Sequence, residues 1–225
     1  MRSGPMTRAL RTRLVSLTLL SLAASVVGCT RTSPPRSAPE PTTANATNAE
    51  THLRELCTLI AQRLELMPGV ARAKWNRKLP ITDLKREQAL LEKMVADGVV
   101  GGLPAEFVTS FFQAQMTAAK LVQERAFAEW TTQQQPPFPD APDLERDIRP
   151  RIDDLNRQML AALKPCWAGR GAEDWTSALE RAKSAAFPAH QPADEILKTA
   201  LQPLLNASLI HRPPDHRQQR TSQRR

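Results

Sequence analysis

Residues 105–130 read AEFVTSFFQAQMTAAKLVQERAFAEW, and this stretch decides the fold class. Its apolar side chains recur three or four residues apart, which places them on one face of a helix. The members of this stripe are Val108, Phe111, Phe112, Ala119, Val122 and Ala126. Nowhere does the sequence alternate polar and apolar residues as a half-buried strand does. The sequence therefore predicts an all-α fold without a sheet.

The segments on either side show the same helical spacing and are separated by turn signals. Thr82 or Asp83 can cap a helix that starts there, and Gly98, Gly101 and Gly102 are expected to end that helix near residue 96. We expect a domain of about six helices. The segments with helical spacing are 50–67, 70–77, 83–96, 105–130, 144–163, 172–186 and 192–205.

Residues 1–28 are similar to an export signal. Four arginines among the first 13 residues precede the apolar run 14–27, which is too short to cross a bilayer but long enough for a signal peptide. The run ends in Val26-Val27-Gly28-Cys29, similar to the site at which bacterial lipoproteins are cleaved and lipidated on the cysteine. We expect a periplasmic protein anchored to a bacterial membrane through Cys29. Ordinary signal cleavage beside an incidental cysteine is the alternative.

Both ends of the chain differ in composition from the part between them. Residues 29–48 are rich in Pro, Ser and Thr, which predicts a flexible tether. Residues 209–225 are predicted to form a disordered basic tail. The net charge is +8, but the signal and the tail each carry four of these positive charges, so the segment between them is neutral. We therefore expect no nucleic-acid partner, and contact with a membrane only through the N-terminal anchor.

Besides Cys29, the chain has two cysteines, Cys57 and Cys166. Export would place them in an oxidising compartment, where a disulfide between them is permitted. Such a bridge would close a loop of about a hundred residues and stabilise the fold by about 4 kcal/mol in the chain-entropy description. Two separate buried thiols are the alternative.

A set of polar residues inside the helical segments carries a resemblance to a known family. In chain order, the set is Arg63, Lys74, the run Asp83-Leu84-Lys85-Arg86-Glu87, Gln123 and the segment Arg149-Pro150-Arg151-Ile152-Asp153-Asp154-Leu155-Asn156. Their spacing resembles that of the chorismate mutases of the AroQ helical class, over roughly residues 50–185. The export signal and the second helical half are similar to the secreted, or gamma, subclass.

The resemblance implies the helical chorismate mutase type II fold, with catalytic helices in 49–165 and a C-terminal helical extension, 166–208, packed on the same domain. It also implies a homodimeric isomerase of the shikimate pathway, in aromatic amino acid biosynthesis. Such an enzyme converts chorismate to prephenate by a Claisen rearrangement. This reaction needs a folded substrate conformer and compensation of charge on the breaking ether oxygen. We therefore expect no cofactor and no metal.

The resemblance assigns catalytic roles to three residues. Lys74 and Gln123 would donate hydrogen bonds to the ether oxygen, and Arg86 would place a further cation at a carboxylate. Because an amide donates at any pH, Gln123 also implies activity that does not collapse between about pH 5 and 8.

Six further residues are expected to bind the substrate. Arg63 and Arg149 would hold its two carboxylates in forked hydrogen bonds. Glu87 would accept from the ring hydroxyl, and Asp83 would orient the groups around it. Leu90 and Ala119 complete the set, although the family often has Ser or Thr where this sequence has Ala119.

Two other functions remain open from the sequence. An isochorismate-pyruvate lyase on the same fold would need a similar set of cations. A non-enzymatic helical envelope lipoprotein, which binds a partner, would not need these residues at all.

Overall fold

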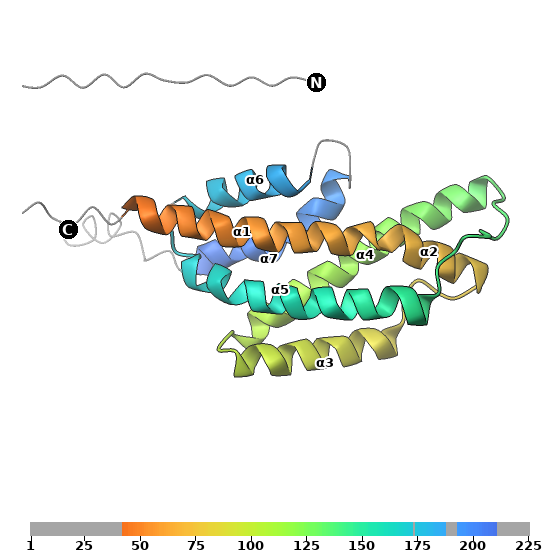
Figure 1. Cartoon of the computed structure of the whole chain (residues 1–225), viewed down its shortest axis with the longest axis horizontal. Helices are drawn as coiled ribbons and strands as arrows, with labels where there is room; N and C mark the ends of the chain where they lie inside the picture. The colour runs from red at the N-terminus through yellow and green to blue at the C-terminus, as the bar shows by residue number, and fades with distance from the viewer. Residues whose placement is uncertain (1–41, 173, 188–192, 211–225) are drawn as a thin grey trace, which may run out of the picture. The chain divides into compact units, whose positions relative to one another are not determined.

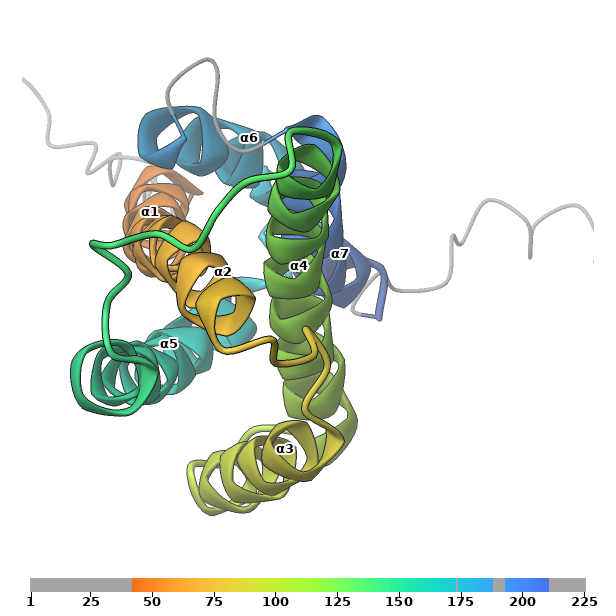
Figure 2. The same ribbon diagram turned by 90° about the vertical axis from the view of Figure 1, so that its right-hand side faces the viewer.

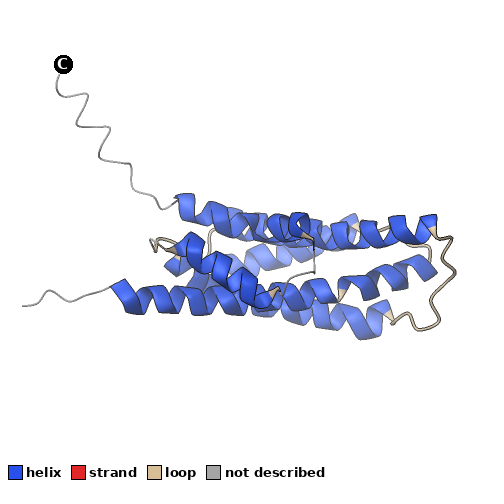
Figure 3. Cartoon of the chain, turned by 90° about the horizontal axis from the view of Figure 1, so that it is seen from above, coloured by secondary structure: helices blue, strands red, loops and turns tan. Residues whose placement is uncertain are grey.

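The computed structural model describes residues 42–172, 174–187 and 193–210. In these residues it contains seven α-helices, one π-helical turn and no strand (Figures 1 and 3). The elements are α1 Thr42–Glu65, α2 Met67–Asn76, α3 Leu84–Val100, α4 Ala105–Thr132, η1 Leu144–Ile148, α5 Arg149–Gly169, α6 Trp175–Ala186 and α7 Asp194–Ile210. The all-α prediction is confirmed. None of the described helices is both long enough and apolar enough to cross a membrane.

Several sequence predictions fall wholly or partly on residues outside this description. These are the signal segment 1–28, Cys29, the tether up to residue 41 and the tail from residue 211. The tether prediction is wrong for residues 42–48, because α1 begins at Thr42. The last proline of the tether is Pro41, and residues 42–48 contain neither proline nor glycine. The amphipathic helix that follows can therefore extend back over them at little cost.

Two helices, α1 and α4, carry most of the packing. In the view along the helices, α4 has α2 and α7 on opposite sides, with α3 against its lower part (Figure 2). α1 packs against α5 on one side and α6 on the other. The buried side chains of these helices form one hydrophobic cluster, which includes Leu53, Phe111, Met159 and Leu204.

α1 and α2 are separated only by Leu66, and the chain continues in nearly the same direction (Figure 1). Leu66 keeps helical dihedral angles, with φ −77° and ψ −18°, and its carbonyl accepts from Val70 N at 3.1 Å. Pro68 stands in the first turn of α2, where its missing N–H breaks no helical hydrogen bond. Arg63 and Lys74, eleven residues apart, therefore lie on one side of an almost continuous rod.

Gly98 has a different role from the one predicted. α3 continues past it to Val100 and ends at Gly101, so the expectation that Gly98 helps to end the helix near residue 96 is wrong. A Cβ atom at Gly98 would lie 2.7 Å from Cγ2 of the buried Val108. Glycine is therefore needed here for the close approach of the end of α3 to the start of α4.

Of the two alternatives for the cysteines, the structure contains the separate thiols and not the disulfide. Cys57 in α1 and Cys166 in α5 are buried, unbonded thiols, as in the alternative considered above. Each lies in the hydrophobic cluster and packs as a small apolar side chain. Burial raises the pKa of Cys57 to about 12 and also raises that of Cys166.

We predict that both thiols resist alkylation in the folded protein at neutral pH. A raised pKa leaves almost no thiolate, the reactive form, so iodoacetamide should modify them on the order of a thousandfold more slowly than in denaturant. Peptide mass spectrometry after labelling, with and without denaturant, checks this. A peptide pair joined through Cys57 and Cys166, released only by a reductant, would contradict the free-thiol structure.

Candidate active site

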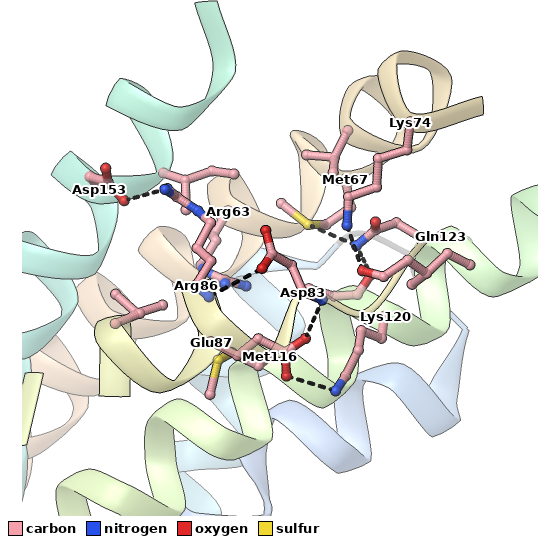
Figure 4. A pocket seen from close by; sticks show the side chains of 15 residues that line it. Arg63, Met67, Lys74, Asp83, Arg86, Glu87, Met116, Lys120, Gln123 and Asp153 are labelled. Atoms are coloured by element: carbon pink, nitrogen blue, oxygen red, sulfur yellow. Dashed lines mark hydrogen bonds and ion pairs between the residues drawn. The ribbon is translucent and has the colours of Figure 1, made fainter. Parts of the chain in front are cut away.

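One pocket gathers eight of the nine residues predicted to bind or transform a substrate. It has a volume of about 110 Å³ and lies among α1, α2, α3, α4 and α5 (Figure 4). The eight are Arg63, Lys74, Asp83, Arg86, Glu87, Leu90, Ala119 and Gln123. Side chains from four helices, and Asp83 just before α3, thus converge on a single space that α5 also borders.

Arg63 is a buried cation whose protein partners are all neutral. Its side chain lies near the end of α1, and the residue is only 4% exposed. Nε donates to Asn156 Oδ1 at 3.1 Å, and one terminal nitrogen donates to the carbonyl of Gln115 at 3.0 Å. Burial lowers the pKa of Arg63 to about 10, and no carboxylate of the described residues forms an ion pair with it. A guanidinium has five N–H donors, so three remain for an anion in the pocket.

Lys74 contributes a second cation, from α2. Its Nζ donates to the carbonyl of Ile81 at 2.5 Å, in the turn between α2 and α3. Burial lowers the pKa of Lys74, and the nearby Asp83 and Glu87 carboxylates act against this shift. An ammonium carries three donors, so two remain beyond the bond to Ile81.

Gln123 lies on α4, is 4% exposed, and borders the same pocket. Its Nε2 donates to the Ala119 carbonyl at 3.0 Å and contacts the sulfur of Met67 at 4.0 Å. The carbonyl of Ala119 fixes the orientation of the amide, because only the nitrogen can donate to it. Thioether sulfur is a weak acceptor, so the second hydrogen of Nε2 is available to an oxygen of a ligand.

Two carboxylates are held at the start of α3. Asp83 caps this helix, since its side chain accepts from Arg86 N at 3.2 Å. Glu87 reaches back and accepts from Asp83 N at 3.4 Å. These reciprocal bonds fix both acidic groups at the edge of the pocket, next to the ion pair between Arg86 and Asp153 at 3.1 Å.

Lys120 is a pocket residue that the sequence analysis missed. Its Nζ lies 2.9 Å from Glu87 Oε2, and both side chains are about one quarter exposed, at 26% and 23%. Helical spacing on α4 could have identified it, since Lys120 follows Ala119 and precedes Gln123 by three residues. The other lining residues that were missed are Met67, Val70, Ile81, Met116, Ile152 and Asp153.

Arg149 is the one predicted residue that does not line the pocket. η1 and α5 meet at this position, and the Arg149 N–H donates to the Leu144 carbonyl, five residues back. The guanidinium forms an ion pair with Glu145 and lies 3.8 Å from Asp83 Oδ2. Arg149 therefore stands behind Asp83, at the rim.

The charges of the pocket divide into a paired rim and an unpaired interior. In the described part of the chain, Glu87 pairs with Lys120, Asp153 with Arg86, and Asp83 with Arg149. Arg63 and Lys74 have no carboxylate within ion-pair distance among these residues. Two partly or fully buried cations beside an amide donor form a site suited to a small dianion that carries an additional acceptor oxygen.

Known proteins are similar to this chain in sequence and in fold. Residues 54–124 match the family model of chorismate mutase type II. The chain is 33% identical over 131 residues to a secreted chorismate mutase of Mycobacterium tuberculosis, covering 58% of this chain and 65% of that protein. It is 34% identical over 114 residues to a monofunctional chorismate mutase of Enterobacter agglomerans, covering 49% and 60%. The matches thus span less than two thirds of these curated relatives.

Solved structures extend the comparison. The crystal structure of a chorismate mutase from Burkholderia thailandensis superposes with a TM-score of 0.63 at 34% identity, covering 68% of this chain and 99% of that chain. A chorismate mutase from Burkholderia phymatum, 24% identical, superposes with a TM-score of 0.61 and covers 69% and 97%. At that identity, the second likeness supports the fold alone.

Proposed function

Because the chain belongs to the helical type II chorismate mutase family, we propose that it is an isomerase that converts chorismate to prephenate in the pocket described above. The observation that carries this proposal is the pair of cations, Arg63 and Lys74, that lack a carboxylate partner among the described residues and border one pocket with Gln123. Chorismate is a dianion with an ether oxygen, and its chemistry matches that set of donors.

The rearrangement breaks a C–O bond and forms a C–C bond within one molecule, so the protein supplies position and charge rather than a nucleophile. Arg63 holds one carboxylate through its free N–H groups. Lys74 Nζ and Gln123 Nε2 donate to the ether oxygen, where negative charge develops in the transition state. Their existing bonds, to Ile81 and Ala119, hold both groups in place before the substrate binds, which avoids reorganisation during the reaction.

The rim completes the binding of the substrate. Glu87, fixed by Lys120, accepts from the ring hydroxyl, while Asp83 orients the groups around it. Arg86 leaves Asp153, and Arg149 leaves Asp83, to bind the carboxylates of the substrate. Both exchanges break exposed or long ion pairs, at 3.1 and 3.8 Å, which contribute little stability. Leu90 and Ala119 form part of the apolar wall.

The decisive experiment is a prephenate assay on the full chain with chorismate. Lys74→Ala should lower kcat by about a hundredfold or more, because one donor to the ether oxygen is lost. Lys93→Ala is the matched control, since Lys93 is an exposed lysine paired with Asp97 on α3, and its activity should stay at the wild-type level. Pyruvate from isochorismate without prephenate from chorismate would favour the lyase. Turnover of neither substrate would favour the non-enzymatic lipoprotein.

Asn156→Asp tests whether the free charge of Arg63 binds the substrate. The nearly isosteric change places a carboxylate on Arg63 Nε, which neutralises the guanidinium inside the protein. We expect KM for chorismate to rise about tenfold or more, with a smaller change in kcat, and no loss of thermal stability.

Asn206→Asp, the same substitution at an exposed position of α7, serves as its control and should leave KM unchanged. An Asn156→Asp enzyme with wild-type KM would show that Arg63 does not contact the substrate.

Gln123 predicts how activity responds to pH. An amide donates a hydrogen bond at any pH. The kcat/KM of the wild type should therefore not collapse between about pH 5 and 8 through loss of the donor at Gln123. In Gln123→Glu the carboxyl donates only while protonated, so its activity should fall as pH rises through the pKa of that group. Parallel pH profiles measure this difference, and profiles of the same shape would contradict the role of Gln123.

We also propose export, lipidation at Cys29 and a homodimer. Export is supported by the signal-like residues 1–28 and by the secreted relatives of M. tuberculosis and Yersinia pestis. The lipid anchor, and with it a periplasmic location, rests on the sequence around Cys29. The homodimer rests on the family resemblance.

A further inference from the structure

Gln115 is a fully buried polar residue of α4 with contacts on two opposite sides. Its main-chain carbonyl accepts from Arg63 at 3.0 Å. Its side-chain Nε2 donates to the carbonyl of Ala200, in α7, at 2.8 Å. One residue therefore joins the buried cation of the pocket to the C-terminal helix.

This link is important because few hydrogen bonds hold the Arg63 side chain in place. Apart from Gln115, its polar partner among the described residues is Asn156 of α5, and neither partner carries a charge that would hold the guanidinium by attraction. The direction of its free N–H groups then depends on where these two acceptors lie. Forked recognition of a carboxylate tolerates errors of only about 0.5 Å in such positions.

α7 is itself fixed to the bundle by a second, comparable bond. Trp175 of α6, 2% exposed, donates through Nε1 to the Leu204 carbonyl at 2.9 Å. Ala200 and Leu204 are one helical turn apart, so Gln115 and Trp175 hold neighbouring turns of α7. Of these two residues, only Gln115 also contacts Arg63. Loss of the Trp175 bond can therefore serve as a control for loss of the Gln115 bond.

We propose that Gln115 is a positioning residue through which α7 fixes the guanidinium of Arg63. The C-terminal extension is then a working part of the substrate-binding site, although α7 lies outside the segment 54–124 matched by the family. The kinetic meaning of this inference rests on the proposed function, since it assumes that Arg63 binds a carboxylate of chorismate.

The kinetic test compares Gln115→Met with Trp175→Phe in the full chain. Each variant loses one hydrogen bond to α7, and Trp175→Phe also removes part of a buried ring system. Gln115→Met should raise KM for chorismate roughly tenfold and change kcat by less than about threefold, because a clamp on the carboxylate acts equally in the ground and transition states. Trp175→Phe should lower the melting temperature at least as much, because it also leaves a cavity, and should leave KM unchanged. An unchanged KM in Gln115→Met, or an equal rise in both variants, would overturn the proposal.

A second measurement does not depend on turnover. The buried Nε–H of Arg63 exchanges slowly and should give a resolved nitrogen–proton NMR resonance, assigned by its absence in Arg63→Lys. We expect this resonance to shift or broaden in Gln115→Met and to stay in place in Trp175→Phe. If the wild type fails to convert chorismate, the proposed function fails, while this resonance still decides the role of Gln115. A resonance that does not move in Gln115→Met would overturn that role.

Discussion

The burial of the Arg63 guanidinium is the constraint on which the rest of the structure depends. A charge removed from water costs several kcal/mol unless neighbours compensate it. Here the neighbours are an amide oxygen and a main-chain carbonyl, which satisfy two N–H groups but do not cancel the charge. α1, α4 and α5 must therefore meet at one point to supply these acceptors, and the remaining charge is directed at the pocket.

The charge compensation of cations also differs between the interior of the pocket and its rim. Carboxylates could have neutralised every cation, yet those of the pocket pair with Lys120, Arg86 and Arg149 at its edge. This division leaves Arg63 and Lys74 poorly compensated where water is scarce and electrostatic interactions are strong. The almost continuous rod of α1 and α2 carries both residues, so the packing of one helix pair sets their separation.

Helical periodicity predicted the fold class and the core of α4, because burial of one face imposes a spacing that is visible in the sequence. Family resemblance predicted most of the pocket for a different reason, since it depends on residue types at fixed separations. Lys120 was missed because an isolated lysine on a helix is usually solvated, and only the fold shows Glu87 opposite it.

The errors concern contacts between segments that are distant in sequence. Gly98 was taken as a helix terminator, because the close approach of Val108 cannot be read from the neighbours of Gly98 in the chain. For Cys57 and Cys166 the sequence left a bridge and two separate thiols open, and the hydrophobic cluster accommodates them as separate thiols. The place of Arg149 at the rim, beside Asp83 and Glu145, likewise could not be read from its neighbours in the chain. Every lining residue of the pocket, on five helices and in the segment between α2 and α3, belongs to the same chain. Two inactive copies with different defects in the pocket could not restore each other by assembling, so mixed subunits would show no complementation.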